Sequence, residues 1–202
     1  MINLAILISG RGSNMRAILK FASKKKTINP VIVISNNHLA PGIKIASKFG
    51  IQTEIIENTK DQNVYDKKLL TTLKKYDVTP KNGLICLAGF MRILSNDFIK
   101  KYKNRIINIH PSLLPAFHGL NAQKQAIQYG VKYSGCTVHL VDSGIDTGPI
   151  ILQAITKVDE HDNIVSLSKK ILSKEHQIYV RAIELFAAKK ICIKGRIVKI
   201  NK

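Results

Sequence analysis

Short apolar runs alternate with amphipathic stretches along the first half of the chain. Near-continuous apolar strands between helices are typical of a parallel sheet that is covered on both faces. We therefore predict a doubly wound α/β fold with a mostly parallel central sheet. The expected strands are Asn3 to Ile8, Val31 to Ser35, Gln52 to Ile56, Gly83 to Ala88 and Arg105 to Ile109, and the expected helices are Asn14 to Ala22, Pro41 to Phe49, Asn63 to Tyr76 and Ser95 to Tyr102.

The pattern changes after Pro115. Two β-rich runs joined by a glycine-containing loop predict an antiparallel or mixed edge at the C-terminal end of the sheet. Because the chain has no internal repeat and no linker, residues 1–202 are predicted to form a single domain. The expected elements are a helix over Ala122 to Tyr129, strands over Cys136 to Val141 and Pro149 to Thr156, a long helix from Ile164 to Ala188 and a strand over Arg196 to Ile200.

The chain is strongly basic, with 32 Lys and Arg against 13 Asp and Glu, for a net charge of +19. The basic residues are mostly scattered lysines without an arginine-rich stripe, so a basic surface is favoured over a nucleic-acid-binding module. The first carboxylate is Glu54, so the preceding segment would tolerate an anion well. The three cysteines are far apart, and no leader or membrane span is evident at the N-terminus, which together favour a cytoplasmic protein.

A glycine-rich turn, Ser9-Gly10-Arg11-Gly12-Ser13-Asn14, follows the first expected strand. Such a turn at a helix N-terminus is a natural phosphate site. A third glycine of the dinucleotide fingerprint is absent, because Met15 stands in its place, and no Walker lysine follows. A small phosphate monoester held by Gly12, Ser13 and Asn14 is one interpretation, and a plain turn with Ser13 or Asn14 capping the helix is the other.

Asn108 and His110 lie two residues apart at the end of an expected strand, so their side chains share one face. An amide can stabilise an oxyanion and an imidazole can move a proton, as acyl-type transfer requires. Asp146, in a later glycine-rich loop, is in a position to orient His110 and raise its pKa. The alternative for both acids is a turn in which Asp caps the backbone, which is favoured for Asp142 and only weakly for Asp146. The alternative for His110 is a structural histidine, and the other histidines, His139 among them, lack metal-ligand spacing and are expected in supporting or surface positions.

Together these segments resemble the phosphoribosylglycinamide formyltransferases of purine synthesis. The resemblance rests on Gly10-Arg11-Gly12-Ser13-Asn14, Leu87 to Leu94, Asn108-Ile109-His110-Pro111-Ser112-Leu113-Leu114-Pro115, Asp142 to Pro149 and Glu175-His176, and it spans nearly the whole chain. The Asn-x-His-Pro segment alone is shared with the wider family of formyltetrahydrofolate-using enzymes. The glycine turn separates the ribonucleotide enzymes and the deformylases from the tRNA formyltransferases.

The resemblance implies transfer of a formyl group from 10-formyltetrahydrofolate to the amine of 5-phosphoribosylglycinamide, without a metal. It assigns catalysis to Asn108, His110 and Asp146, and contacts with the ribonucleotide to Gly12, Ser13, Asn14 and Glu175. The partners are then small molecules, with no nucleic acid and no membrane. It assigns the folate site to Met91, Arg92, Ile93 and Leu94, with Asn108, Val141, Asp142 and Asp146.

Several alternatives to these assignments stay open. Judged from the sequence alone, Met91 and Leu94 are more typical of core residues. Glu175 is equally consistent with a solvated position on the long helix. Gln62 and Asn121 stand where the family usually has Arg and His, which affects folate affinity. Deformylation by water, or formylation of another amine, would use the same Asn, His and Asp without needing the glycine turn.

Overall fold

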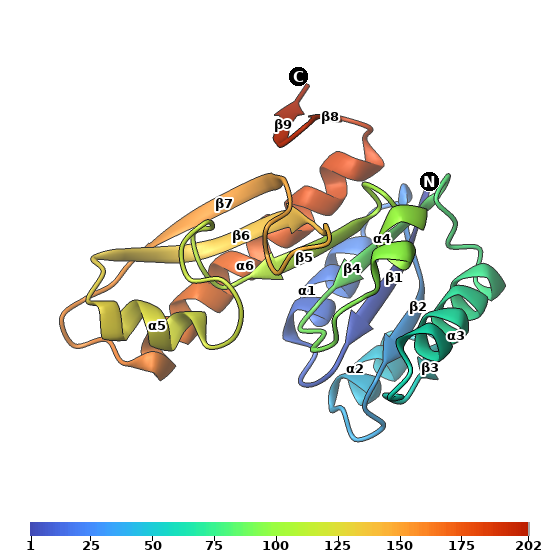
Figure 1. Ribbon diagram of the computed structural model, residues 1–202, viewed down its shortest axis with the longest axis horizontal. Helices are drawn as coiled ribbons and strands as arrows, with labels where there is room; N and C mark the ends of the chain where they lie inside the picture. The colour runs from blue at the N-terminus through green and yellow to red at the C-terminus, as the bar shows by residue number, and fades with distance from the viewer. Residues whose placement is uncertain (202) are drawn as a thin grey trace. The chain divides into compact units, whose positions relative to one another are not determined.

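The computed structural model describes residues 1–201, and the chain divides into two compact units, Met1–Ile107 and Asn108–Lys202. Figure 1 shows the elements of each unit in chain order by colour. The first unit contains β1 (Ile2–Ile8), α1 (Ser13–Ala22), β2 (Ile28–Ser35), α2 (Gly42–Lys48), β3 (Thr53–Ile55), α3 (Gln62–Lys75), β4 (Gly83–Leu87) and α4 (Asn96–Lys101).

The first unit is built on parallel strands. β1 pairs in parallel with both β2 and β4, and β2 pairs in parallel with β3. β1 and β4 are apolar along almost their whole length and are buried, as strands covered on both faces should be. Helices α1 and α2 pack against each other and against β2. Asp61 and Ser95 cap α3 and α4 by accepting hydrogen bonds from backbone N–H groups of the first turn.

The second unit is built on an antiparallel hairpin and one long helix. β6 (Tyr133–Leu140) pairs with β7 (Ile150–Lys157), and the 24-residue α6 (Ile164–Ala187) packs on both strands (Figure 1). A capping box between Asn163 and Ser166 fixes the start of α6. The unit also contains α5 (Ala122–Tyr129) and a small antiparallel pair, β8 (Ile191–Lys194) with β9 (Ile197–Ile200).

The seven main strands have the order β3-β2-β1-β4-β5-β6-β7, where β5 is Ile106–His110. The predicted α/β fold with a mostly parallel sheet and an antiparallel C-terminal edge is confirmed. Most predicted elements agree with the observed ones to within three residues. Strand β8 was not predicted, because its four residues are only partly buried and carry little periodic signal. Among residues 1–201, no helix is both long and apolar enough to cross a membrane.

Candidate active site

A cluster of polar side chains surrounds the C-terminal end of β5, in the second unit. Asn108 and His110 project from the same face of β5, as predicted, and both contact Asp146. The Asn108 Nδ2 atom lies 3.3 Å from Asp146 Oδ1, and His110 Nδ1 lies 3.1 Å from Asp146 Oδ2. The three residues predicted as the catalytic set are therefore neighbours in the structure.

Asp146 is held as a carboxylate. Burial raises its pKa, but hydrogen bonding with His139 and the Gly119 N–H, together with the charge of His110, lowers the pKa to about 2. The Gly119 N–H donates to Oδ2 at 2.9 Å. The backbone of Asp146 is left-handed, with φ at 55°, an unfavourable conformation that Asp and Asn tolerate better than most residues.

His110 is buried, with 4% of its surface exposed. Its Nε2 atom lies 2.7 Å from the Phe117 carbonyl oxygen, so both ring nitrogens face oxygen acceptors. Burial lowers the pKa of His110, and this outweighs the opposing effects of the Phe117 carbonyl and of Asp146. Asp146 therefore acts on the pKa of His110 in the predicted upward direction, but burial, which the sequence does not reveal, has the larger effect and lowers the pKa overall.

The sequence leaves His139 between a supporting and a surface position, and the structure places it in the same cluster. It lies on β6 and is 2% exposed. Its Nδ1 atom lies 2.8 Å from the Leu140 carbonyl oxygen, and its Nε2 atom lies 3.3 Å from Asn108 Nδ2 and 3.5 Å from Asp146 Oδ1. No motif marks this residue; the only signal in the sequence is a histidine between the apolar Val138 and Leu140.

The loop after His110 is fixed by side chains of the hairpin. Thr137 donates to the Ser112 carbonyl at 2.7 Å and accepts from the Leu114 N–H at 3.1 Å. Gln153 on β7 donates to the Leu114 carbonyl at 2.9 Å. These bonds hold the segment that presents the Phe117 carbonyl to His110.

The loop between β6 and β7 contains the two predicted acidic residues. Asp142 Oδ1 accepts hydrogen bonds from the Gly144 N–H at 3.1 Å and from the Thr147 hydroxyl at 2.6 Å. Asp142 thus forms the turn that was expected of it. Val141 and Asp142 are both partly exposed, so a ligand could reach this loop.

In the first unit, the glycine turn after β1 leads into α1. The N-cap of α1 is Gly12, in the left-handed conformation with φ at 71°, and no side chain caps the helix. The alternative in which Ser13 or Asn14 caps α1 is therefore wrong. A Cβ on Gly12 would lie 2.9 Å from the Gly42 Cα, so the turn is closely packed against the start of α2. α1 has no acidic residue in its first turn, which leaves its positive end uncompensated.

The predicted folate segment, residues 91–94, has side chains of two kinds. Met91 and Ile93 are 69% and 70% exposed, whereas Leu94 is buried, as the core alternative expects. The Met91 N–H donates to the Ser9 hydroxyl at 2.8 Å. Two apolar side chains on a segment with an anchored backbone are suited to contact a flat apolar ligand.

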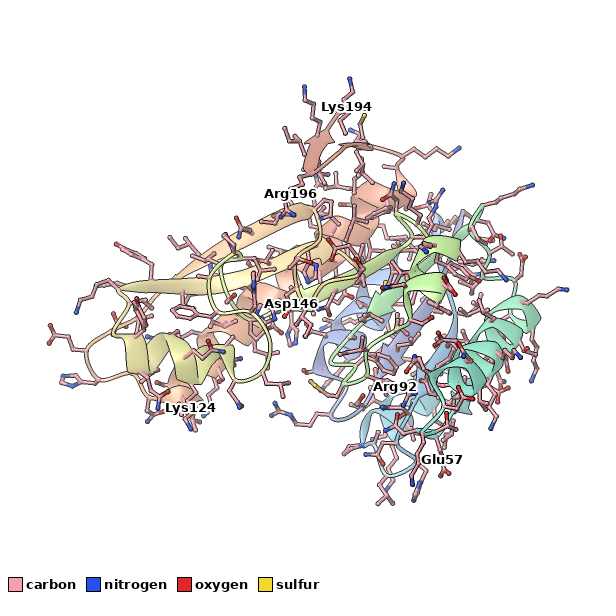
Figure 2. The ribbon with its side chains drawn as sticks, in the orientation of Figure 1. Glu57, Arg92, Lys124, Asp146, Lys194 and Arg196 are labelled. Atoms are coloured by element: carbon pink, nitrogen blue, oxygen red, sulfur yellow. The ribbon has the colours of Figure 1, made fainter. Side chains whose placement is uncertain are left out.

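Arg92 points into the first unit rather than to solvent (Figure 2). Its Nη2 donates to the Gln62 Oε1 at 2.8 Å, and the guanidinium lies 4.2 Å from the centre of the Tyr65 ring. Gln62 also donates to Asp66 at 2.9 Å and to the Ile93 carbonyl at 3.2 Å. Gln62 therefore supports the 91–94 segment from inside.

Two further residues named from the sequence lie in the second unit. Glu175 is 7% exposed, so a solvated face of α6 is excluded for it. Burial and then the charge of Glu175 raise the pKa of Cys136 to about 12, which places the carboxylate near β6. Asn121 occupies the left-handed N-cap of α5, with φ at 59°.

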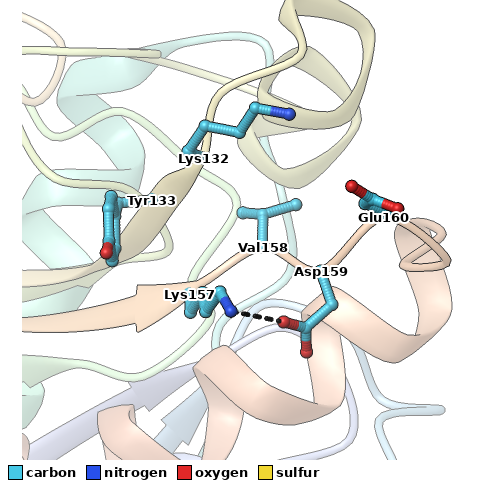
Figure 3. Close-up of a pocket in the computed structure, with 6 residues that line it drawn as sticks. All are labelled: Lys132, Tyr133, Lys157, Val158, Asp159 and Glu160. Carbon is cyan, nitrogen blue, oxygen red and sulfur yellow. Dashed lines mark ion pairs between the residues drawn. The ribbon is translucent and has the colours of Figure 1, made fainter.

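An open cavity of about 370 Å³ lies elsewhere in the second unit, at the ends of β6 and β7. Figure 3 shows its lining, with Lys157 paired to Asp159. None of the predicted site residues lines this cavity. Among residues 1–201, no group of three or more His, Cys, Asp and Glu side chains is arranged to hold a metal ion.

The whole chain is similar to known formyltransferases. A sequence model described as Formyl transferase matches residues 2–183. The crystal structure of glycinamide ribonucleotide transformylase 1 from Symbiobacterium toebii is 42% identical, with a TM-score of 0.95 over 100% of this chain and 95% of that chain.

Two curated relatives differ greatly in length. The phosphoribosylglycinamide formyltransferase of Escherichia coli is 38% identical over 92% of this chain and 87% of its own length. The trifunctional purine biosynthetic protein adenosine-3 of Drosophila pseudoobscura is 44% identical over 92% of this chain, but this chain spans only 14% of that protein. The family predicted from the motifs is confirmed, and the chain belongs to the formyl transferases.

Proposed function

We propose that this chain transfers the formyl group of 10-formyltetrahydrofolate to the primary amine of 5-phosphoribosylglycinamide in purine synthesis. The amine forms a new bond to the formyl carbon, the bond from that carbon to N10 of the folate breaks, and a proton of the amine ends on N10. The observation that carries this proposal is the contact of Asn108, His110 and Asp146 within one buried cluster. The names of full-length relatives support the same activity.

In this proposal, the oxyanion of the tetrahedral intermediate is stabilised by Asn108 and His110. The 3.3 Å contact of Asn108 Nδ2 to Asp146 is long, so this N–H can turn toward a stronger acceptor. Burial favours a neutral His110 in the resting enzyme, and a negative charge developing beside it would favour its protonated form. Asp146, with its low pKa, stays ionised to stabilise that imidazolium.

The phosphate of the ribonucleotide is assigned to the turn formed by Gly12, Ser13 and Asn14. The uncapped positive end of α1 supports this assignment, as does the absence of acidic residues before Glu54. Glu175, a buried carboxylate, is assigned to the cationic or amide part of the same substrate. These contacts are proposed for each unit by itself.

With each unit taken by itself, the folate is assigned to residues 91–94 of the first unit and to Asn108, Val141, Asp142 and Asp146 of the second. Support comes from the exposed side chains of Met91 and Ile93, because a pterin is flat and its ring faces can pack against apolar side chains. Arg92 contributes by anchoring this segment rather than by presenting its charge. Because Gln62 is occupied by Arg92 and Asp66, a contact from Gln62 to the folate tail is not proposed.

The test is a spectrophotometric assay of folate product from a 10-formylfolate donor, with and without 5-phosphoribosylglycinamide. We expect turnover only when the ribonucleotide is present. Turnover without it would instead identify a deformylase, and turnover with another amine alone would identify a different transferase. The matched control is Asp146→Asn, which keeps the size of the side chain but removes its charge and should abolish most of the signal.

A further inference from the structure

We infer that His139 is a positioning residue that holds the Asn108 amide with its nitrogen directed toward Asp146. This inference rests on the proposed function, because it concerns the orientation of a group in that reaction. His139 has no motif and no assigned role, yet it is one of the most buried polar residues in the second unit. Its two ring nitrogens have different partners, and these partners determine what it can do.

The Leu140 carbonyl oxygen fixes the tautomer of His139. A carbonyl oxygen can only accept a hydrogen bond, so the 2.8 Å contact requires a proton on Nδ1. In the neutral ring, Nε2 then carries a lone pair. Nε2 lies 3.3 Å from Asn108 Nδ2 and 3.5 Å from Asp146 Oδ1. In the neutral ring its lone pair accepts one of the two N–H groups of Asn108, whereas a ring protonated on both nitrogens would donate to Asp146 instead.

The orientation of the Asn108 amide follows from this tautomer. Its nitrogen lies between two acceptors, Nε2 of His139 and Oδ1 of Asp146, each at 3.3 Å. The reversed amide would place its oxygen against a lone pair and a carboxylate, both of which repel it. His139 and Asp146 therefore select the same end of the amide, and the N–H donor that an oxyanion needs stays beside the Asp146 carboxylate.

The strand geometry explains why His139 can serve as a fixed reference point. The pairing of β6 with β7 shifts register between Val138 and His139, which is where a bulge changes the direction of a side chain. The ring is bonded to the backbone of its own strand and is almost fully buried. Such supporting groups hold a catalytic side chain in its productive geometry.

The test compares two substitutions that keep opposite halves of the imidazole. His139→Gln places an amide near the Nε2 position and can still accept from Asn108. His139→Asn places its amide near the Nδ1 position, so it can still bond Leu140 but cannot reach Asn108. We expect His139→Asn to lower kcat about tenfold or more, with the KM for the ribonucleotide unchanged, and His139→Gln to recover much of kcat.

Two further variants separate positioning from simple destabilisation. Ser134→Ala is the matched control, because Ser134 is buried on the same strand and its hydroxyl has no hydrogen-bond partner; kcat should be unchanged. In an Asn108→Ala background, His139→Asn should add little to the loss of kcat, since the group that it positions is gone. Additive losses, or equal losses in the Gln and Asn variants, would overturn the inference.

A measurement on the unmodified protein covers the case in which neither variant folds. The ¹⁵N NMR spectrum of the His139 ring should show the neutral Nδ1–H tautomer, and a proton on Nε2, in a neutral or a doubly protonated ring, would overturn the inference. The proposed function fails separately, if the unmodified protein has no ribonucleotide-dependent turnover. Normal turnover of His139→Asn in an active enzyme would overturn only the role of His139.

Discussion

The cluster around Asp146 in the second unit and the glycine turn before α1 in the first unit are built in opposite ways. The cluster uses side chains: Asn108, His110 and His139 each contact Asp146, and Asn108 also contacts His139. The turn uses backbone: Gly12 is left-handed, no side chain caps the helix, and its shape depends on close packing against Gly42.

This difference follows from what each region is proposed to do. Moving a proton requires side chains with controlled protonation states, and burial among hydrogen-bonding partners provides that control. Binding a phosphate requires several N–H donors in a concave arrangement, which the backbone supplies without any titrating group. Substitutions in the cluster should therefore change kcat, and substitutions in the turn should change KM.

The largest effect is expected when the cluster loses its central charge or its imidazole. Asp146→Ala and His110→Ala should each reduce kcat by about two orders of magnitude or more, the usual scale for an acid–base group. Steady-state kinetics with both substrates measures this, and circular dichroism checks that each variant folds. Near-normal turnover in either variant would contradict the role proposed for that residue.

A smaller effect, on KM, is expected in the turn. Ser13→Pro removes a backbone donor and also restricts Gly12, so the KM for the ribonucleotide should rise about tenfold. Ser13→Ala keeps the N–H and loses only the hydroxyl, so its KM should rise less. If kcat falls while the KM for the ribonucleotide stays unchanged in both Ser13 variants, the proposed division between the two regions is wrong.

A still smaller change in KM is expected from the residue that packs against the turn. A Cβ on Gly42 would lie 3.0 Å from the Gly10 carbonyl oxygen and 2.6 Å from the Ile8 side chain. Gly42→Ala should therefore shift the turn, lower the melting temperature and raise the KM for the ribonucleotide a few-fold. Gly10→Ala is the control for stability, because its Cβ would meet nothing within 4 Å.

The smallest expected effect concerns stability as a function of pH. The pKa of His110 is lowered by burial, so the unfolded chain takes up a proton near pH 6.5 before the folded chain does. The contribution of His110 is thus complete above that pH and is lost as the pH falls below it. The free energy of unfolding, measured with denaturant, should fall less between pH 8 and pH 5 for His110→Gln than for the unmodified protein.

Asp146 contributes to stability in a separate, more acidic range. Its folded pKa of about 2 lies below the ordinary value of 3.8. Its contribution is therefore complete above about pH 4 and is lost as the pH falls toward 2. In Asp146→Asn, which lacks the carboxylate, the free energy of unfolding should not show this loss between pH 4 and pH 2.

The sequence predicts local relationships well. The two-residue spacing of Asn108 and His110 places them on one face of a strand, and the structure agrees. The cap of α1 was less predictable, because Gly12 takes that position only when its backbone is left-handed. The contribution of His139 could not be predicted, since it depends on the pairing of β6 with β7 and on a shift in that pairing.

The pKa of His110 shows the same limit. The charge of Asp146 acts in the predicted direction, but the larger effect is burial by segments that are distant in sequence. Similarly, the substitution of Arg by Gln at position 62 indicates a lost ligand contact when only the sequence is considered. The structure gives Gln62 an internal role instead, with Arg92 and Asp66 as partners.

The left-handed backbone of Asp146 should restrict which residues are accepted at this position in a library of random variants. Most residues at position 146 would be rejected by the backbone alone, whereas Gly and Asn would pass. Selection for folded protein should therefore enrich Gly and Asn beside Asp, and selection for growth without external purines should keep Asp alone. Sequencing the two survivor pools would separate the conformational requirement at this position from the chemical one.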